Sequence, residues 1–192
     1  MLNIIAGTLS TGAPPVAPSS YESIATVTVG SGGAGEVEFT SIPSTYTHLQ
    51  IRGITRFTRT ADSTGSLFMR FNGDTGSNYS FHQLYTYGFD SSPNVDSGAS
   101  VSYMSPSFIP SDFNSASIYG AVVIDILEYK NTNTYKTMRA LGGFDPNSIY
   151  GSNVFASSNW RNTNAITSIK LYPNVNVFNQ YTQFALYGIK GV

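Results

Sequence analysis

Alternation of apolar and polar residues with a period of two is the feature that most constrains this chain, and it recurs from Tyr21 almost to the C-terminus. In SLFMRF, for example, Leu67, Met69 and Phe71 fall on one face, with Phe68 and Arg70 on the other. Successive side chains of a β-strand point to opposite faces, so the pattern predicts half-buried strands. After Tyr21 we find no convincing helical spacing with caps. The longest apolar run, 121–127, is rich in Val and Ile and favours a central strand.

Short clusters of turn-forming residues separate the alternating runs. These clusters are GSGGAG (30–35), FNGDTGSN (71–78), FDSSPNVDSG (89–98), SPSFIPSDFNS (105–115), KNTNT (130–134) and DPN (145–147). About ten strands without intervening helices predict an all-β fold, an antiparallel β-sandwich or jelly roll. A parallel α/β fold is excluded, and no repeat of 20–50 residues supports a propeller or solenoid.

The first twenty residues differ from the rest and suggest the only domain boundary. Residues 1–20 carry no charge, hold three prolines, and begin with an apolar tip. One interpretation is a disordered terminus. We favour an extended anchoring arm, because disordered segments are usually poor in large aliphatic residues. We therefore expect an arm over 1–20 and one β-sandwich domain over 21–192, with these arm residues packing on a neighbouring subunit or on the chain's own domain: Leu2, Ile4, Ile5 and Leu9.

Charge and cysteine content restrict the partners. Charged residues make up 11% of the chain, against about 25% in typical domains, and the net charge is −1. Such a chain has no field to gather phosphates, so we expect no nucleic-acid partner. The absence of cysteine excludes disulfides, thiolate metal sites and cysteine nucleophiles. No apolar run is long enough to span a membrane and no secretory signal is present, which predicts a soluble protein made in a cytoplasm, without a membrane partner.

Several short motifs resemble functional sites, and we interpret each as structural. The glycines of 30–35 lack the Lys and helix of a phosphate-binding loop. Asp74-Thr75-Gly76 matches the tripeptide of aspartic proteases but lies in a dense turn, and the calcium-like oxygen donors of 72–78 lack a closing bidentate acid. His48 and His82 form no metal-binding motif. We therefore predict no enzymatic activity, no metal and no cofactor.

Aromatic residues are the most informative positive feature, at 14% of the chain. They suit cross-strand pairs, subunit interfaces or sugar-stacking platforms. The single tryptophan lies in SSNWRNTN, and Trp160, Arg161 and Asn162 form a candidate glycan-binding group there. The other interpretation, which we favour, is a Trp that plugs a sandwich edge or an interface, with Arg161 paired locally.

Three strings suggest a family. SYESIATVTVGSGGAGEVEFTSIPSTYTHLQIRGITR, RFNGDTGSNYSFHQL and FALYGIKG resemble small structural proteins of tailed bacteriophages, particularly those that infect marine and cyanobacterial hosts. The resemblance implies a virion component assembled in the host cytoplasm. It leaves open whether the copies decorate the capsid, form a collar or belong to a tail appendage, and it transfers no catalytic residue.

We therefore expect a non-enzymatic virion subunit, present in multiple copies that contact each other and other virion proteins through the arm and aromatic interfaces. The alternative is a glycan-binding, receptor-recognising module of a tail fibre, with a host surface glycan as its partner.

Overall fold

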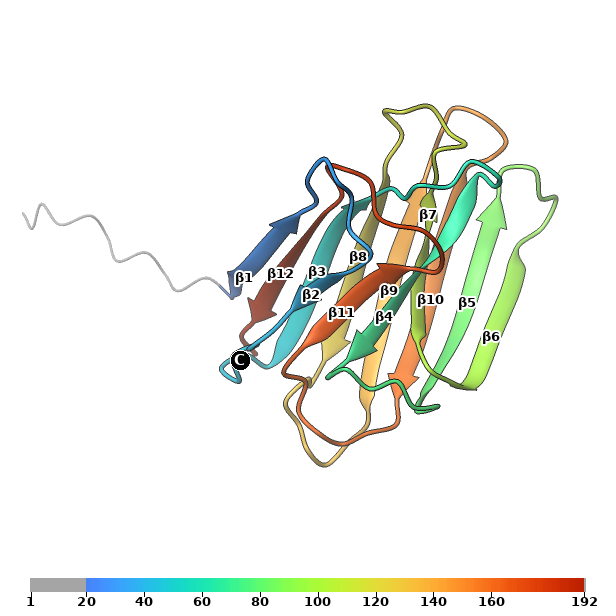
Figure 1. Ribbon diagram of the computed structural model, residues 1–192. Coiled ribbons are helices and arrows are strands. Elements are labelled where there is room, and N and C mark those ends of the chain that lie inside the picture. Colours follow the sequence, from blue (N-terminus) through green and yellow to red (C-terminus); the bar gives the residue numbers. More distant parts are fainter. Residues whose placement is uncertain (1–19, 192) are drawn as a thin grey trace, which may run out of the picture.

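The alternating runs form the strands of two packed antiparallel sheets in the computed structural model, which describes residues 20–191 (Figure 1). The larger sheet has eight strands in the order β1-β12-β3-β8-β9-β10-β5-β6, and the smaller has four in the order β2-β11-β4-β7. The strands within the described residues are β1 (Tyr21–Thr28), β2 (Val37–Phe39), β3 (His48–Thr55), β4 (Thr64–Phe71), β5 (Tyr79–Tyr87), β6 (Asn94–Val101), β7 (Met104–Pro110), β8 (Gly120–Leu127), β9 (Lys136–Phe144), β10 (Ser152–Trp160), β11 (Ile169–Pro173) and β12 (Gln183–Ile189).

Eight of these strands follow the order of a jelly roll. Its successive strands B to I form one sheet in the order B-I-D-G and a second in the order C-H-E-F. With β1, β2, β3, β4, β7, β8, β11 and β12 as B to I, the two orders become β1-β12-β3-β8 and β2-β11-β4-β7, as observed. The predicted antiparallel sandwich of jelly-roll type is confirmed.

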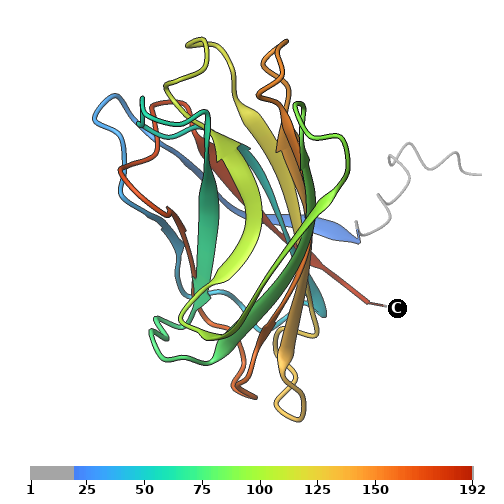
Figure 2. The same cartoon turned by 90° about the vertical axis from the view of Figure 1, so that its right-hand side faces the viewer.

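The remaining four strands are two hairpins that widen one sheet. β5 and β6 lie between β4 and β7 in the chain, and β9 and β10 lie between β8 and β11. In space they follow one another beyond β8, so half of the larger sheet consists of inserted strands. Strand β7 packs beneath β9 and β10, which gives the inner face of this extension a partner layer (Figure 2).

The core lies between the two layers and follows the predicted alternation. Leu49, Ile51 and Ile124 project from the larger sheet, and Leu67 and Met69 from the smaller one; all five are fully buried. Burial of such side chains contributes on the order of 2 kcal/mol each before the entropic cost of ordering the chain.

Two strands were missed in the sequence because they contain turn-forming residues. We expected a strand at 100–104 between turns at 89–98 and 105–115, whereas β6 spans 94–101 and β7 spans 104–110. Both are edge strands, where proline removes no ladder hydrogen bond that a neighbour needs, so Pro106 and Pro110 are tolerated in β7. Gly98 of β6 leaves room for the Phe81 ring, because a Cβ there would lie 2.5 Å from it.

Candidate functional site: an outer apolar row and an aromatic pocket

An apolar row crosses the outer face of the larger sheet. Cross-strand pairing places Val123 of β8 beside Leu141 of β9, then Phe155 of β10, Leu84 of β5 and Val95 of β6. We call these five residues the outer apolar row. They are between 39% and 79% exposed, so no part of residues 20–191 covers them. The row borders a hollow of about 490 Å³ at its β5–β6 end. Isolated exposed apolar residues are ordinary, but a contiguous row over five strands is typical of an interaction surface.

A polar row runs beside the apolar one, one pleat further along the strands. Its central members are Asp125, Arg139, Ser157 and His82, again in direct cross-strand register. Gln50 extends it through an amide hydrogen bond to the Asp125 carboxylate, at 2.7 Å. The outer face therefore combines an apolar centre with a polar rim, as protein interfaces do.

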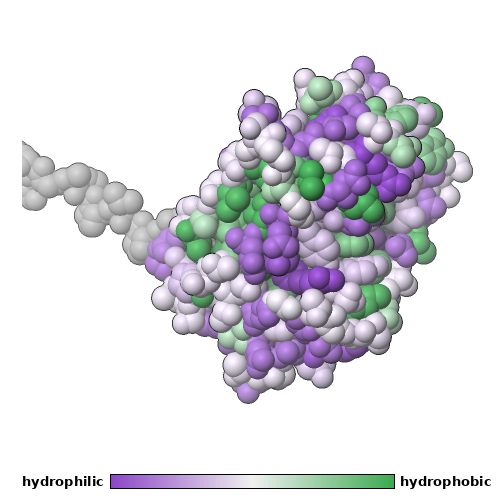
Figure 3. All heavy atoms as spheres, viewed as in Figure 1, coloured by the Kyte–Doolittle hydropathy of each residue, from purple (hydrophilic) through white to green (hydrophobic). Residues whose placement is uncertain are grey.

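The outward face of the smaller sheet has a different character. There Lys170 forms an ion pair with Glu36 at 2.8 Å, and the Arg70 guanidinium lies over the Tyr172 ring, 4.9 Å from its centre. Figure 3, which views the molecule as Figure 1 does, shows hydrophilic groups across much of this side with only scattered hydrophobic residues. The charged groups satisfy one another locally. The contrast identifies the outer face of the larger sheet as the better candidate for a protein contact.

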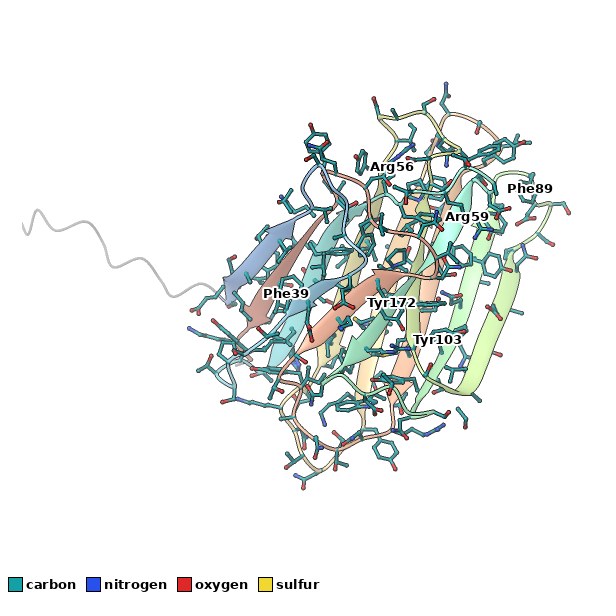
Figure 4. The ribbon with its side chains drawn as sticks, in the orientation of Figure 1. Phe39, Arg56, Arg59, Phe89, Tyr103 and Tyr172 are labelled. Carbon is teal, nitrogen blue, oxygen red and sulfur yellow. The ribbon has the colours of Figure 1, made fainter. Side chains whose placement is uncertain are left out.

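A second surface is an aromatic pocket at one end of the sandwich. Four rings line it, from Tyr87 and Phe89 at the end of β5, Phe113 in the β7–β8 connection and Tyr150 in the β9–β10 connection, together with the loop 61–64. Its volume is about 460 Å³. The rings of Tyr87 and Phe89 are stacked with centres 5.2 Å apart, and those of Phe113 and Tyr150 meet edge to face at the same separation. Figure 4 shows Phe89 at this end, together with Arg56 and Arg59.

Buried Arg56 holds the connection that carries Phe113. Its guanidinium pairs with Asp112 at 2.9 Å and donates to the backbone carbonyls of Asn114, Ser115 and Ile118, each at 2.8 Å. The arginine is only 3% exposed, so these bonds are shielded from competing water. The β7–β8 connection is thereby fixed along most of its length.

Further hydrogen bonds join the separate walls of the pocket. The Asn114 amide donates to the Ser63 carbonyl at 2.6 Å, and the Phe113 N–H donates to the Arg59 carbonyl at 3.1 Å. On the opposite wall the Gly88 N–H donates to the Gly151 carbonyl at 2.9 Å, which ties the Phe89 turn to the Tyr150 loop. The pocket is therefore held open by the fold itself.

The chemistry of the pocket is that of neutral donors beside one carboxylate. Burial raises the pKa of Tyr87 to about 12, and Tyr85 and Asp90 add to the effect, so its phenol is protonated at neutral pH. The Asp62 side chain is 55% exposed and forms an ion pair with Arg59. Arg59 is not a lining residue, and no other cationic side chain within residues 20–191 lines the pocket.

The structure corrects the interpretation of Trp160 as a sugar-stacking platform. Trp160 is 1% exposed and packs against the rings of Phe71 and Tyr79. Its indole N–H donates to the Asp74 carboxylate at 2.7 Å. The ring has no free face, because the rings of Phe71 and Tyr79 pack against it at the end of β10. The favoured interpretation, a Trp that plugs the sandwich, describes its position.

The other two members of that group are also placed by the fold. Arg161 donates to the Ser77 carbonyl at 2.6 Å and to the Ser100 hydroxyl at 3.3 Å, so its partners come from the β4–β5 connection and from β6. The side chain of Asn162 caps its own turn, accepting the Asn164 N–H at 2.9 Å. These residues do not converge with the aromatic pocket, which sequence reasoning missed because its walls come from four separate connections.

Asp74, in the protease-like triplet, has a structural role. Its carboxylate accepts the Gly76 N–H and the Asn78 amide as well as the Trp160 indole N–H. Burial opposes its ionisation, but these three hydrogen bonds and the charge of Arg70 together outweigh it and lower the pKa of the carboxyl. The turn interpretation of this loop matches the geometry.

In residues 20–191 no three His, Asp or Glu side chains gather as metal ligands would. Nor does this part of the chain include a helix of the length and apolarity that crossing a bilayer requires. The arm residues Leu2, Ile4, Ile5 and Leu9 lie outside the described residues.

Fold and surfaces together define a jelly-roll β-sandwich with one enlarged sheet, an exposed apolar row and an aromatic pocket. No family model matches the chain, and neither the curated proteins nor the solved structures contain a significant match.

Proposed function

We propose that this chain is a non-enzymatic structural subunit of a bacteriophage virion, assembled in multiple copies on the capsid surface or at a tail or collar appendage. The observation that carries the proposal is the outer apolar row, which offers each copy a contact surface. The resemblance of the sequence to phage structural proteins supports the virion setting. The jelly-roll order adds an argument by analogy, since viral capsid domains often use this fold, as do proteins of other functions.

The occupant that fits the outer face best is a second copy of the chain. Six adjacent strands, β3 to β6 in sheet order, present a face of roughly 29 by 24 Å, on the order of 700 Å². Standard protein interfaces bury about 600–1,000 Å² on each partner, and the face falls within this range. Two-fold packing would place the apolar row of one copy against that of the next and exclude water from both.

The anchoring arm would supply a second contact. Strand β1, which starts at Tyr21, is the edge of the larger sheet furthest from the inserted hairpins. We propose that Leu2, Ile4, Ile5 and Leu9 attach the subunit to a neighbouring virion protein, while the outer row joins copies to each other.

Two measurements test the proposal. Mass spectrometry of purified virions is expected to detect the chain among the particle proteins; its absence, where other structural proteins are recovered, would reject the virion assignment. Sedimentation of the purified chain over a wide concentration range is expected to show self-association that Leu141→Lys weakens at least tenfold.

Tyr135→Lys provides the matched control, because Tyr135 is also more than half exposed but lies in the β8–β9 connection, away from the row. Self-association that survives Leu141→Lys, or that both variants weaken equally, would show that the outer row is not the contact.

A further inference from the structure

The aromatic pocket has the composition of a carbohydrate site. A pyranose ring has an apolar C–H face that stacks on aromatic rings, and its edge of hydroxyl groups pairs with carboxylates, phenols and hydroxyls. The pocket offers both types of group, with rings on two walls and Asp62 and Ser63 in the loop between them. Its volume of about 460 Å³ falls within the range of about 300–1,000 Å³ for small-molecule sites.

We propose that the aromatic pocket binds a neutral pyranose sugar, presented on a surface glycan or an oligosaccharide. The exposed fractions of three rings carry the argument: Phe89 is 56% exposed, Phe113 47% and Tyr150 37%. Exposure of large apolar rings to water is unfavourable. Three such rings held around one hollow therefore suggest that a ligand covers them. The rings of Phe89, Tyr87 and Phe108 form a continuous stack that continues into the domain, which keeps Phe89 from collapsing into the pocket.

Rigidity supports the same conclusion. The Arg56 network and the bonds from Asn114 and Gly88 fix the walls before any ligand arrives. A preorganised site loses less conformational entropy on binding, which matters for weakly binding ligands such as single sugars. Asp90 adds to this by accepting the Tyr87 N–H at 2.8 Å and the Asn94 amide at 2.6 Å, which holds the turn that carries Phe89.

The charge of the pocket lining favours neutral sugars over acidic ones. The lining contains the Asp62 carboxylate and no Lys, Arg or His, and the nearby Arg59 is already engaged by Asp62. An acidic sugar would bring a second carboxylate to the Asp62–Arg59 pair, whose single positive charge is already balanced by Asp62, and this is unfavourable. A neutral hexose pays no such penalty and can donate hydroxyl hydrogens to Asp62. The site is therefore expected to discriminate against uronic acids.

The pocket is separate from the surface proposed for assembly. It is built from the connections at one end of the sandwich, whereas the outer apolar row lies on the sheet face, and the two share no residue. Sugar binding therefore goes beyond the structural role, and a failure of either proposal leaves the other standing.

Titration of matched sugars tests the inference. Methyl glucosides and methyl galactosides of both anomers, and the corresponding glucuronic and galacturonic acids, are titrated into the full-length protein and followed by ligand-observed NMR and calorimetry. At least one neutral sugar is expected to bind in the millimolar range or tighter, and at least tenfold more tightly than its uronic acid.

Variants locate the site. Phe89→Ala and Phe113→Ala are each expected to weaken binding at least tenfold, because each removes a stacking face, while Asp62→Asn is expected to reduce the preference over the uronic acid. Tyr181→Ala is the control, since Tyr181 is 66% exposed in the β11–β12 connection outside the pocket. Trp160 fluorescence and circular dichroism verify the fold of each variant.

Three results would overturn the inference. They are saturation by no neutral sugar in the panel, equal binding by Phe89→Ala and the unaltered chain, and uronic acids binding as tightly as the neutral sugars.

Discussion

Replacement of Asp74 by alanine tests whether the β4–β5 loop is a structural link to the core. Asp74 accepts hydrogen bonds from Gly76 at 2.8 Å, Asn78 at 2.9 Å and the Trp160 indole at 2.7 Å. An indole N–H left without a partner at a buried position costs about 1–3 kcal/mol, and loss of the turn adds about 1 kcal/mol. We therefore expect the free energy of unfolding to fall by about 2–4 kcal/mol, or Tm by about 4–16 °C.

The assay uses the protein's single tryptophan, Trp160, as its reporter. Urea unfolding followed by its fluorescence gives the midpoint and slope for the unaltered chain and for each variant. Asp145→Ala is the matched control, because the Asp145 carboxylate also caps a turn, by accepting the Asn147 N–H at 2.8 Å, but does not link that turn to the core. The control is expected to lose about 1 kcal/mol or less. Equal losses for the two variants would refute the link between the loop and Trp160.

The contribution of Asp74 also depends on pH. Folding lowers the pKa of this carboxyl below its ordinary value of 3.8, so the folded state binds the proton less readily than the unfolded state. Its stabilisation is fully present above pH 3.8 and is lost as the pH falls through the lowered pKa of the folded state. The stability gap between the unaltered chain and Asp74→Ala should therefore be constant near neutral pH and narrow in acid. A gap that widens in acid would contradict this reasoning.

Three further predictions address packing, the pocket and the arm. Gly188→Ala should cost about 1–3 kcal/mol in thermal or urea unfolding, because its Cβ would lie 2.3 Å from the Tyr46 ring, whereas Gly30→Ala, which meets open space, should be neutral. Arg56→Met should lower the free energy of unfolding by about 3–5 kcal/mol, since it removes the cation that pairs with Asp112 and donates to three backbone carbonyls, and a loss below 1 kcal/mol would show that water replaces it. Deletion of residues 1–20 should leave a folded β-domain by circular dichroism but reduce its incorporation into virions; normal incorporation would remove the arm from the assembly proposal, and loss of folding would show that the arm completes the domain's own core.

Local pattern was sufficient to place side chains on faces of strands. Leu67, Met69 and Phe71 were expected to share a face, and all three are fully buried. Alternation within 79–87 likewise places Leu84 and Tyr79 on opposite faces, and the structure has Leu84 half-exposed and Tyr79 buried. This part of the fold is readable because the orientation of a side chain along a strand depends only on residue parity.

The environment of single residues needed the neighbouring strands. Trp160 sits among Ser and Asn residues that suggest a loop, yet contacts from Phe71 and Asp74, far away in the chain, bury it. Strand β7 was hidden by Pro106 and Pro110, which a strand tolerates only at a sheet edge. Whether a strand is at an edge depends on the order of strands, which local propensity does not encode.

The amino-acid sequence by itself determined the all-β class, the antiparallel sandwich and the inward and outward faces of most strands, since these follow from alternation and turn residues within short windows. Only the tertiary structure decided which outward residues meet. Val123, Leu141, Phe155, Leu84 and Val95 form one row because two hairpins from separate connections pair beyond β8, in a register set by long-range hydrogen bonding. The aromatic pocket likewise exists only because four connections converge at one end of the sandwich.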